Sequence, residues 1–238
     1  MIKLIFFDTE TTGNTEKDFL VQIAYKDGNE TFSELYKPEI KIPPEASAVH
    51  HITNKMVADK QIFRESKDFT QIKKLFEDND SVVVAHNALF DLMILAKEDI
   101  KPNKFICTLR VARELDSEGK IERYNLQYLR YLLDLDIEAT AHDALGDVLV
   151  LEKLFERLKN KLTKEGELSE EDAIKKMIEI SSHPSLMRTI NFGKHNGKKI
   201  EEVLATDRGY LQWLLSQKLE SDQIEDDWIY TLKHHLEK

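Results

Sequence analysis

The sequence predicts an α/β fold in which helices cover a mixed β-sheet. Three β-like runs follow one another before residue 37 and are joined by short loops, a pattern typical of an antiparallel meander. From residue 66 to about residue 159, segments with helical spacing alternate with short apolar runs, which are typical of buried strands. A meander followed by alternating helices and strands indicates a single mixed sheet flanked by helices.

The first strand is expected from Ile2 to Phe7, and two acidic residues, Asp8 and Glu10, follow it directly. Side chains two positions apart on a strand point to the same face, so these two carboxylates are aimed at one point. Like charges held close together repel each other unless a proton or a cation lies between them, and a hard divalent cation suits oxygen ligands. An isolated pair of this kind is more often a polar strand end, so the interpretation depends on the rest of the chain.

The remaining elements of the first part follow in order along the chain. Prolines at 38, 43 and 44 are expected to interrupt regular structure, and Asn87 is expected to cap a helix. The expected strands cover residues 19–25, 31–36, 81–86 and 104–107, with a turn at 26–29. The expected helices cover residues 66–77, 88–98, 108–115, 125–133 and 142–159.

Three units are expected along the chain. Residues 1–160 form the first domain, and a polar, charged segment at 161–182 reads as a linker that contains a helix ending near residue 180. Gly166 and the helix-start signal at 168–172 mark this boundary. Residues 183–238, which begin with His183 and Pro184, are expected to form a small C-terminal module.

Composition is ordinary for a soluble globular protein, with 41% hydrophobic and 33% charged residues. No apolar run is long enough to span a bilayer, and the N-terminus lacks the pattern of an export signal. A single cysteine, Cys107, fits a reducing compartment and is expected to pack in the core, so the predicted location is the cytoplasm. The net charge of −10 argues against a general electrostatic binder of nucleic acid. A polyanionic substrate would therefore require bound cations or local basic patches.

Further acidic residues and histidines lie at positions where a structural role alone is awkward. Asp91 lies in the first turn of a helix that follows a buried strand, where a favourable contact with the helix dipole is a fair alternative explanation. His142 precedes the last helix of the first part, and Asp147 lies within it among apolar neighbours. Burying Asp147 without a partner would be costly. Each pattern is weak alone.

Taken together, these positions resemble a known family of nucleases. The pattern Asp8-x-Glu10, then Asp91 in H-N-A-x-F-D, then His142 and Asp147 in H-x-A-x-x-D, resembles the DEDDh, or DnaQ-like, 3′→5′ exonucleases. The resemblance includes the loop at 42–53, and it implies an RNase H-like fold with a mixed five-stranded sheet. Residues 106–113, 124–129 and 192–215 are most similar to the exodeoxyribonuclease X branch of that family.

The resemblance implies a metal-dependent hydrolysis of phosphodiester bonds. Two divalent cations, Mg²⁺ or Mn²⁺, would be held by the carboxylates, with Asp8 bridging both, Glu10 and Asp147 completing the first site, and Asp91 holding the second. His142 would be the general base that takes the proton from the attacking water. The expected activity is removal of nucleoside 5′-monophosphates from DNA 3′ ends, in DNA repair or end trimming.

Contacts with the substrate are also implied by the resemblance. Thr11, Thr12 and Gly13 would face the terminal nucleotide, with Glu45 and His50 near its sugar or phosphate. Phe90 is a further candidate, although it could equally be a packing residue, as could His86 and His51.

The C-terminal module carries the clearest basic cluster of the chain, formed by Arg188, Lys194, His195, Lys198 and Lys199. Lys194, Lys198 and Lys199 are candidates for an auxiliary contact with nucleic acid, against a purely structural or partner-docking role. Residues 210, 213, 214 and 215 lie at helical spacing, which is more typical of a core face than of a base-stacking platform.

Other functions stay open at this point. The expected partner is DNA, as single strands or duplex 3′ ends, and RNA is an alternative because the residues do not show a pocket that senses the 2′-hydroxyl. A proofreading subunit resembling DNA polymerase III epsilon would use the same chemistry. From a different class, the chain could be a nucleic-acid binding module without turnover. No membrane partner is expected.

Overall fold

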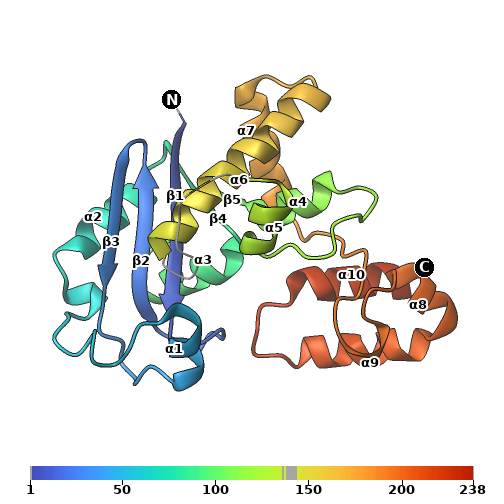
Figure 1. Cartoon of the computed structure of the whole chain (residues 1–238), viewed down its shortest axis with the longest axis horizontal. Coiled ribbons are helices and arrows are strands. Elements are labelled where there is room, and N and C mark those ends of the chain that lie inside the picture. Colours follow the sequence, from blue (N-terminus) through green and yellow to red (C-terminus); the bar gives the residue numbers. More distant parts are fainter. Residues whose placement is uncertain (1, 136, 138–143, 238) are drawn as a thin grey trace.

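A computed structural model describes residues 2–135, 137 and 144–237 of the 238-residue chain. Its centre is a five-stranded sheet with the strand order β3-β2-β1-β4-β5 (Figure 1). Strand β1 pairs antiparallel with β2 and parallel with β4, while β2 pairs antiparallel with β3 and β4 pairs parallel with β5. The strands are β1 (Lys3–Thr11), β2 (Leu20–Asp27), β3 (Glu30–Leu35), β4 (Ser81–Ala85) and β5 (Phe105–Cys107). The predicted meander and the mixed five-stranded sheet are both confirmed.

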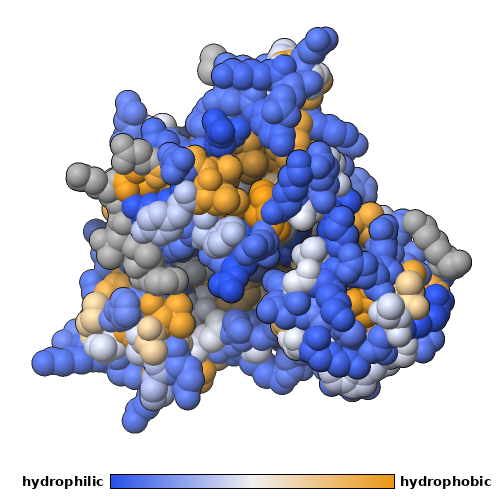
Figure 2. All heavy atoms as spheres, turned by 45° about the vertical axis from the view of Figure 1, so that its right-hand side comes forward, coloured by the Kyte–Doolittle hydropathy of each residue, from blue (hydrophilic) through white to orange (hydrophobic). Residues whose placement is uncertain are grey.

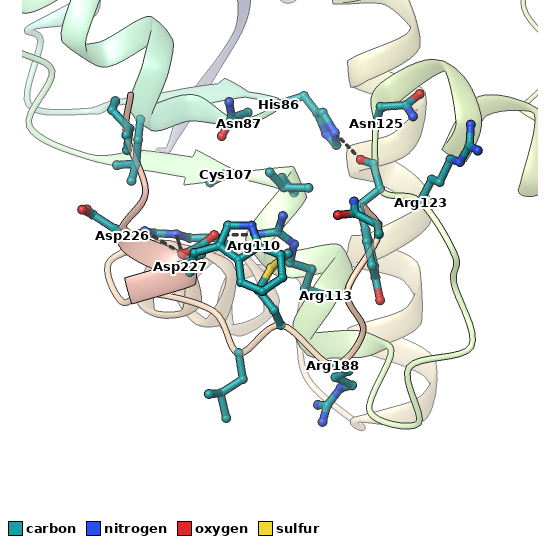
Figure 3. Close-up of a pocket in the computed structure, with 18 of the residues that line it drawn as sticks. His86, Asn87, Cys107, Arg110, Arg113, Arg123, Asn125, Arg188, Asp226 and Asp227 are labelled. Carbon is teal, nitrogen blue, oxygen red and sulfur yellow. Dashed lines mark hydrogen bonds and ion pairs between the residues drawn. The ribbon is translucent and has the colours of Figure 1, made fainter. Parts of the chain in front are cut away.

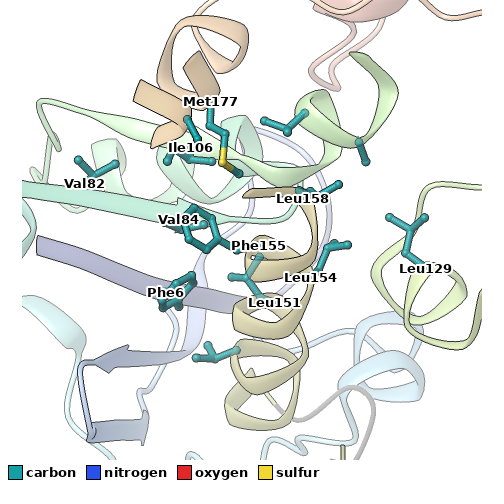
Figure 4. Packing of buried hydrophobic residues seen from close by; sticks show 14 of the residues in the cluster. Phe6, Val82, Val84, Ile106, Leu129, Leu151, Leu154, Phe155, Leu158 and Met177 are labelled. Carbon is teal, nitrogen blue, oxygen red and sulfur yellow. The ribbon is translucent and has the colours of Figure 1, made fainter. Parts of the chain in front are cut away.

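Strand β1 divides its side chains between two hydrophobic cores, one on each face of the sheet. Phe6 belongs to the core under the long helix α6 (Ala144–Glu165), where its ring lies edge-on to Phe155 at 5.2 Å (Figure 4). Phe7 belongs to the opposite core, where its ring meets Phe76 of α2 (Asp68–Phe76) at 5.2 Å. Because alternate side chains share a face, Asp8 and Glu10 continue the Phe6 face toward α6.

Each core is closed by the helices that follow the strands along the chain. The first core also receives side chains from α4 (Thr108–Leu115), α5 (Leu126–Leu132) and α7 (Glu170–Ser181). The second core receives Ala88, Ile94 and Leu95 from α3 (Ala88–Lys97). Cys107 is buried in this second core, as expected, and burial raises the pKa of its thiol.

Two local expectations are wrong. The proline-rich segment contains a helix, α1 (Pro44–His50), because Pro44 occupies the first turn, where its missing N–H is not needed. Asn87 precedes α3 but makes no side-chain cap; it adopts a left-handed conformation (φ 63°), and its carbonyl accepts a hydrogen bond from the Phe90 N–H. A short 3-10 helix, η1 (Phe63–Glu65), precedes α2.

Helix α6 crosses the boundary that the sequence predicted between the first domain and the linker, at residues 160 and 161, and α7 lies within that linker. Helix α6 continues past residue 160 to Glu165, and Leu162 still packs in the first core. Ala173 and Met177 of α7 are buried in the same core. The segment 161–182 therefore packs against the sheet domain, while the proposed three-unit division of the chain stays a prediction.

The rest of the chain, from residue 183 to residue 237, is called the C-terminal unit below. Its helices are η2 (Gly193–His195), α8 (Ile200–Thr206), α9 (Arg208–Leu219) and α10 (Asp226–Leu236). They surround a core of their own that includes Ile190, Val203, Leu211, Leu214 and Leu232. Trp213 departs from the core role expected for the stripe at 210–215, because 54% of its surface is exposed.

The C-terminal unit is joined to the sheet domain by a partly buried ion-pair cluster (Figure 3). Asp227 of α10 accepts hydrogen bonds from Arg110 Nε (3.0 Å) and Arg113 Nη1 (2.5 Å), both on α4. The backbone N–H and the hydroxyl of Ser185 donate to the same carboxylate at 2.9 and 3.0 Å. A cavity of about 490 Å³ lies at this junction.

On the face shown in Figure 2, hydrophobic side chains gather near the centre, and most of the surrounding surface is hydrophilic.

Asp227→Asn is expected to lower the free energy of unfolding by about 2 kcal/mol, because an amide nitrogen would oppose the arginine donors and leave a buried group unsatisfied. Urea denaturation compared with limited proteolysis around residue 185 measures the loss and its location. Asp226→Asn, at the exposed neighbouring position, is the matched control. Equal unfolding midpoints for both variants would contradict a structural role for the Asp227 cluster.

Among the described residues, no helix has the length and apolar character needed to cross a membrane.

Candidate active site

Three carboxylates converge between strand β1 and helix α6. Asp8, Glu10 and Asp147 each offer a carboxylate oxygen, and these atoms lie within 4.8 Å of one another. Strand alternation sets the two β1 side chains on the α6 face, as the sequence predicts. On α6, Asp147 shares a helix face with Leu151 and Phe155, four and eight residues later, and both are buried against the sheet. The packing of this face therefore carries Asp147 to the other two acids.

The electrostatics of this cluster favour a cation. Asp147 is only 9% exposed, and three negative charges at this spacing repel one another in a partly dry environment. Oxygen donors of this kind are the ligands that hard divalent cations prefer. The spacing and the oxygen chemistry of these donors therefore both fit Mg²⁺ or Mn²⁺.

Gln127 is a further residue of this site, and the sequence did not single it out as a candidate. Its side-chain nitrogen donates a hydrogen bond of 2.5 Å to Asp147 Oδ1. Gln127 is presented from the first turn of α5, whose start is capped by Asn125 accepting from the Tyr128 N–H. Arg130 Nη1 donates to the side-chain oxygen Oε1 of Gln127 at 3.3 Å, which orients the amide. Gln127 thus fixes the orientation of one carboxylate of the cluster.

Gln127→Ala is expected to lower activity and divalent-metal affinity by about 10- to 100-fold, the usual effect of removing a partner that orients a ligand. The expected signature is a shift of the Mn²⁺ activation curve to higher concentration. Tyr131→Ala, at an exposed position of the same helix, should leave the curve unchanged. An unshifted curve for Gln127→Ala would contradict this orienting role.

Asp91 lies in the first turn of α3 and contacts β1 through Thr9. Its Oδ1 accepts hydrogen bonds from the hydroxyl (2.6 Å) and the backbone N–H (3.2 Å) of Thr9, the residue between Asp8 and Glu10. Burial raises the pKa of Asp91 to about 7, although both Thr9 bonds oppose the shift. The role of Asp91 as a ligand of the second ion stays a prediction.

The segment after Glu10 forms a tight loop. Thr11 donates from its hydroxyl to the Gly13 carbonyl (2.5 Å), and the Thr12 hydroxyl donates to Asp18 (2.9 Å). A β-carbon at Gly13 would come within 2.5 Å of the Asp18 carboxylate, so any other residue there would displace Asp18 from its hydrogen bonds with Thr12 and Thr15. The Asp18 carboxylate thereby fixes the shape of this loop beside the carboxylate cluster.

The remaining candidates for substrate contact lie on α1 and α3. His50 is buried at the end of α1, where burial lowers its pKa while the backbone of Thr11 opposes that shift. This places His50 beside the loop that follows Glu10. Glu45 is exposed on the first turn of α1, and Phe90 is half-buried against the second core. Contact of these residues with a substrate stays a prediction.

Of the two motif histidines, His86 and His142, the structure describes only His86. His86 is held between the Thr108 hydroxyl (2.9 Å) and the Tyr124 carbonyl (2.6 Å), and burial lowers its pKa to about 4. These contacts hold His86 in place, and the lowered pKa favours its neutral form. His142, the expected general base, lies outside the described residues.

The candidate lysines of the C-terminal unit lie on η2 and on the loop that follows it. Lys194 pairs with Asp207 at 2.7 Å, and His195 Nε2 lies 2.9 Å from the same carboxylate. Lys198 and Lys199 are exposed on the loop that follows η2. Arg188 Nε donates to the Asp116 carbonyl (3.0 Å), so it belongs to the junction with the sheet domain.

Comparison with known families and proteins agrees with this geometry. Residues 5–155 match the RNase T family, described as exonuclease, and residues 190–218 match the exodeoxyribonuclease X-like C-terminal family. Exodeoxyribonuclease 10 of Escherichia coli K12 is 32% identical over all of this chain and 99% of its own length. DNA polymerase III subunit epsilon of Treponema pallidum is 34% identical over 63% of this chain and 73% of its own.

Solved structures give the same assignment. A structure of exonuclease X in complex with 5′ overhanging duplex DNA matches with a TM-score of 0.58 and 29% identity, over 76% of this chain and 99% of the other. Escherichia coli exonuclease I in complex with a dT13 oligonucleotide shares the fold, with a TM-score of 0.56 and 21% identity over 68% of this chain and 42% of that one. The predicted RNase H-like fold is confirmed. The chain therefore belongs to the RNase T, or DnaQ-like, exonuclease family and is a full-length homologue of exodeoxyribonuclease 10 with an exodeoxyribonuclease X-like C-terminus.

Proposed function

We propose that this protein is a divalent-metal-dependent 3′→5′ exonuclease that releases nucleoside 5′-monophosphates from DNA 3′ ends. The observation that carries the proposal is the convergence of Asp8, Glu10 and Asp147 within 4.8 Å, inside a fold that belongs to an exonuclease family. The full-length similarity to exodeoxyribonuclease 10 supports DNA as the substrate and a stand-alone enzyme over a polymerase subunit. Turnover is favoured over a purely binding role because every acid of the motif is present.

The proposed reaction uses two divalent cations, held by Asp8, Glu10, Asp91 and Asp147, which would activate water and neutralise charge on the phosphate and the departing 3′ oxygen. The chain's own groups prepare this site. Gln127 holds the Asp147 carboxylate by a hydrogen bond, and Thr9 holds Asp91 by two. The loop at 11–13 and His50 would position the terminal nucleotide. Mg²⁺ and Mn²⁺ are both proposed on the basis of the oxygen donors.

His142 is proposed as the general base that accepts the proton of the attacking water. An unperturbed imidazole has a pKa near 6.5 and must be neutral to act as a base. The rate is therefore expected to fall about tenfold per pH unit below about pH 6.5, and His142→Ala should abolish this dependence together with most of the activity. A pH–rate profile that stays flat to pH 5.5 would contradict this role.

Direction, product and sugar preference are tested by labelling the two ends of one oligonucleotide. With a 3′ label, labelled mononucleotide should appear at the first turnover, whereas a 5′ label should give a descending ladder. Matched single-stranded DNA, duplex DNA and RNA then rank the substrates, and faster cleavage of RNA would favour the RNA-trimming alternative. Labelled mononucleotide released first from the 5′ end would overturn the proposed polarity. Cytoplasmic location and a role in repair or end trimming remain predictions.

A further inference from the structure

The part of the C-terminal unit that matches the exodeoxyribonuclease X-like family, residues 190–218, folds into one compact motif. A loop at 190–199 returns on itself through hydrogen bonds between Ile190 N–H and the Lys198 carbonyl (2.9 Å), and between Gly197 N–H and the Ile190 carbonyl (2.7 Å). Helix α9 packs beside this loop. Its exposed side chains include Trp213 and three lysines, together with neutral polar residues and two glutamates on the first turn of α8, Glu201 and Glu202.

Tyr210 and Trp213 form an aromatic surface on α9. Their ring centres are 5.5 Å apart, and Trp213 is more than half exposed, although the helix has a buried face available at Leu211 and Leu214. Lys194 Nζ lies 5.1 Å from the centre of the Tyr210 ring, so a cation covers this side of the aromatic pair. Packing within the C-terminal unit does not account for the exposure of a residue as large as tryptophan.

Asp207 fixes this arrangement in place. Its carboxylate caps α9 by accepting from the Tyr210 N–H (3.2 Å), and it also meets Lys194 (2.7 Å) and His195 (2.9 Å). The His195 ring lies edge-on to Tyr210 at 4.7 Å. The loop can approach this closely because residue 193 is glycine with a φ of +62°, and a β-carbon there would come 3.2 Å from the Tyr210 hydroxyl.

The charge of the motif indicates which class of partner it can bind. Residues 190–218 carry five lysine and arginine side chains against three acids, and one of these acids, Asp207, pairs with Lys194. Lys198 and Lys199 are exposed on the same loop, in a chain with a net charge of −10. Exposed aromatic rings beside lysines suit single-stranded nucleic acid, because bases stack on the rings while phosphates meet the cations.

The C-terminal unit also contacts the segment that follows the β1 carboxylates. The connection between α9 and α10 faces the end of β1 (Figure 1), where Asp222 pairs with Lys17 of the loop that follows Glu10, at 2.5 Å. The Asp227 cluster fixes the start of α10 on α4, as described above. A strand whose 3′ end lies at the carboxylates can therefore extend toward a surface that does not move freely relative to them.

We propose that Tyr210, Trp213, Lys194 and Lys198 form a platform that binds the single-stranded segment behind the 3′ end. This platform rests on the proposed exonuclease function, and it gives the C-terminal unit a specific role, which is to strengthen the binding of longer substrates. Bases stack on Trp213 and Tyr210, and Lys198 meets a phosphate.

The first test uses the length dependence of binding. With wild-type protein and Mg²⁺, KM should fall as oligo-dT is lengthened from 3 to 20 nucleotides. Trp213→Ala should raise KM for the 20-mer about tenfold, equivalent to the loss of one stacked base, and should flatten the length dependence. Trp213→Phe should restore most of it, and Gln212→Ala, at an exposed neighbouring position, is the control. An unchanged length dependence in Trp213→Ala would overturn the platform.

The second test measures binding without cleavage, so that the two proposals fail separately. Titration of dT20 into Asp147→Asn protein should quench tryptophan fluorescence, and Trp213→Phe should remove most of the change because Trp228 is buried. Lys198→Ala should reduce the dependence of log affinity on log salt by about 0.7. Quenching without any cleavage by the wild-type protein would support the binding platform and contradict the proposed exonuclease activity. Cleavage without Trp213-dependent binding, or a Trp213-dependent dimer in sedimentation, would overturn the platform alone.

Discussion

Asp147→Asn is expected to lower exonuclease activity by about a thousandfold or more while the protein stays folded. The substitution removes one of three charges that converge within 4.8 Å, and metal-based stabilisation of this reaction amounts to several kcal/mol. The amide oxygen can still accept the hydrogen bond from Gln127, so the packing of α6 should be retained. Steady-state cleavage of labelled DNA at saturating Mn²⁺ measures the loss.

The matched control is Glu156→Gln, which removes a half-exposed carboxylate from the same helix, nine residues further along. Its activity should stay close to that of the wild type, and the circular dichroism spectra of both variants should match it. Activity in Asp147→Asn within tenfold of the wild type would show that this carboxylate is not required for the chemistry.

Asp91→Asn is expected to have two opposite effects. Activity should fall at least about a hundredfold, because the proposed second ion loses a charged ligand. The metal-free protein should become more stable at pH 8, because burial raises the pKa of Asp91 to about 7, so that its ionisation costs folding free energy. Both Thr9 hydrogen bonds can be accepted by the amide oxygen that replaces the carboxylate.

The sign of the pH effect follows from the direction of the pKa shift. The cost of ionising Asp91 is absent below about pH 4, where the carboxyl is protonated in both folded and unfolded chains, and it grows until about pH 7. Asp91→Asn should therefore unfold at the same temperature as the wild type at pH 4 and on the order of 5 °C higher at pH 8 in EDTA. Asp80→Asn, at an exposed acid, should show no such difference. A lower unfolding temperature at pH 8 would contradict the cost of this buried charge.

The positions of Asp8, Glu10 and Asp147 follow from local periodicity, which a sequence displays directly. The alternation of Phe6 and Phe7 between two cores sets the face of the β1 carboxylates, and the i, i+4, i+8 spacing of Asp147, Leu151 and Phe155 sets the face of α6. The individual strands and the meander are predictable for the same reason, since each depends on a pattern within a few residues.

Features that depend on contacts between distant segments could not be predicted in this way. Gln127 meets Asp147 across 20 residues, and Asp227 meets Arg110 across 117, so neither pair has a signal in local spacing. Helical spacing indicated a core role for Trp213, but spacing describes a face without showing what covers it. The left-handed Asn87 is a smaller case, because a backbone carbonyl takes the place of the expected side-chain cap.

The most direct test of the central claim is cleavage of a 5′-labelled single-stranded DNA by wild-type and Asp147→Asn protein in EDTA, Mg²⁺ or Mn²⁺. The carboxylate cluster predicts a ladder that shortens from the 3′ end with either metal, disappears in EDTA and is absent in the variant. A ladder that persists in EDTA, or that the variant produces at the wild-type rate, would contradict metal-dependent catalysis at Asp8, Glu10 and Asp147.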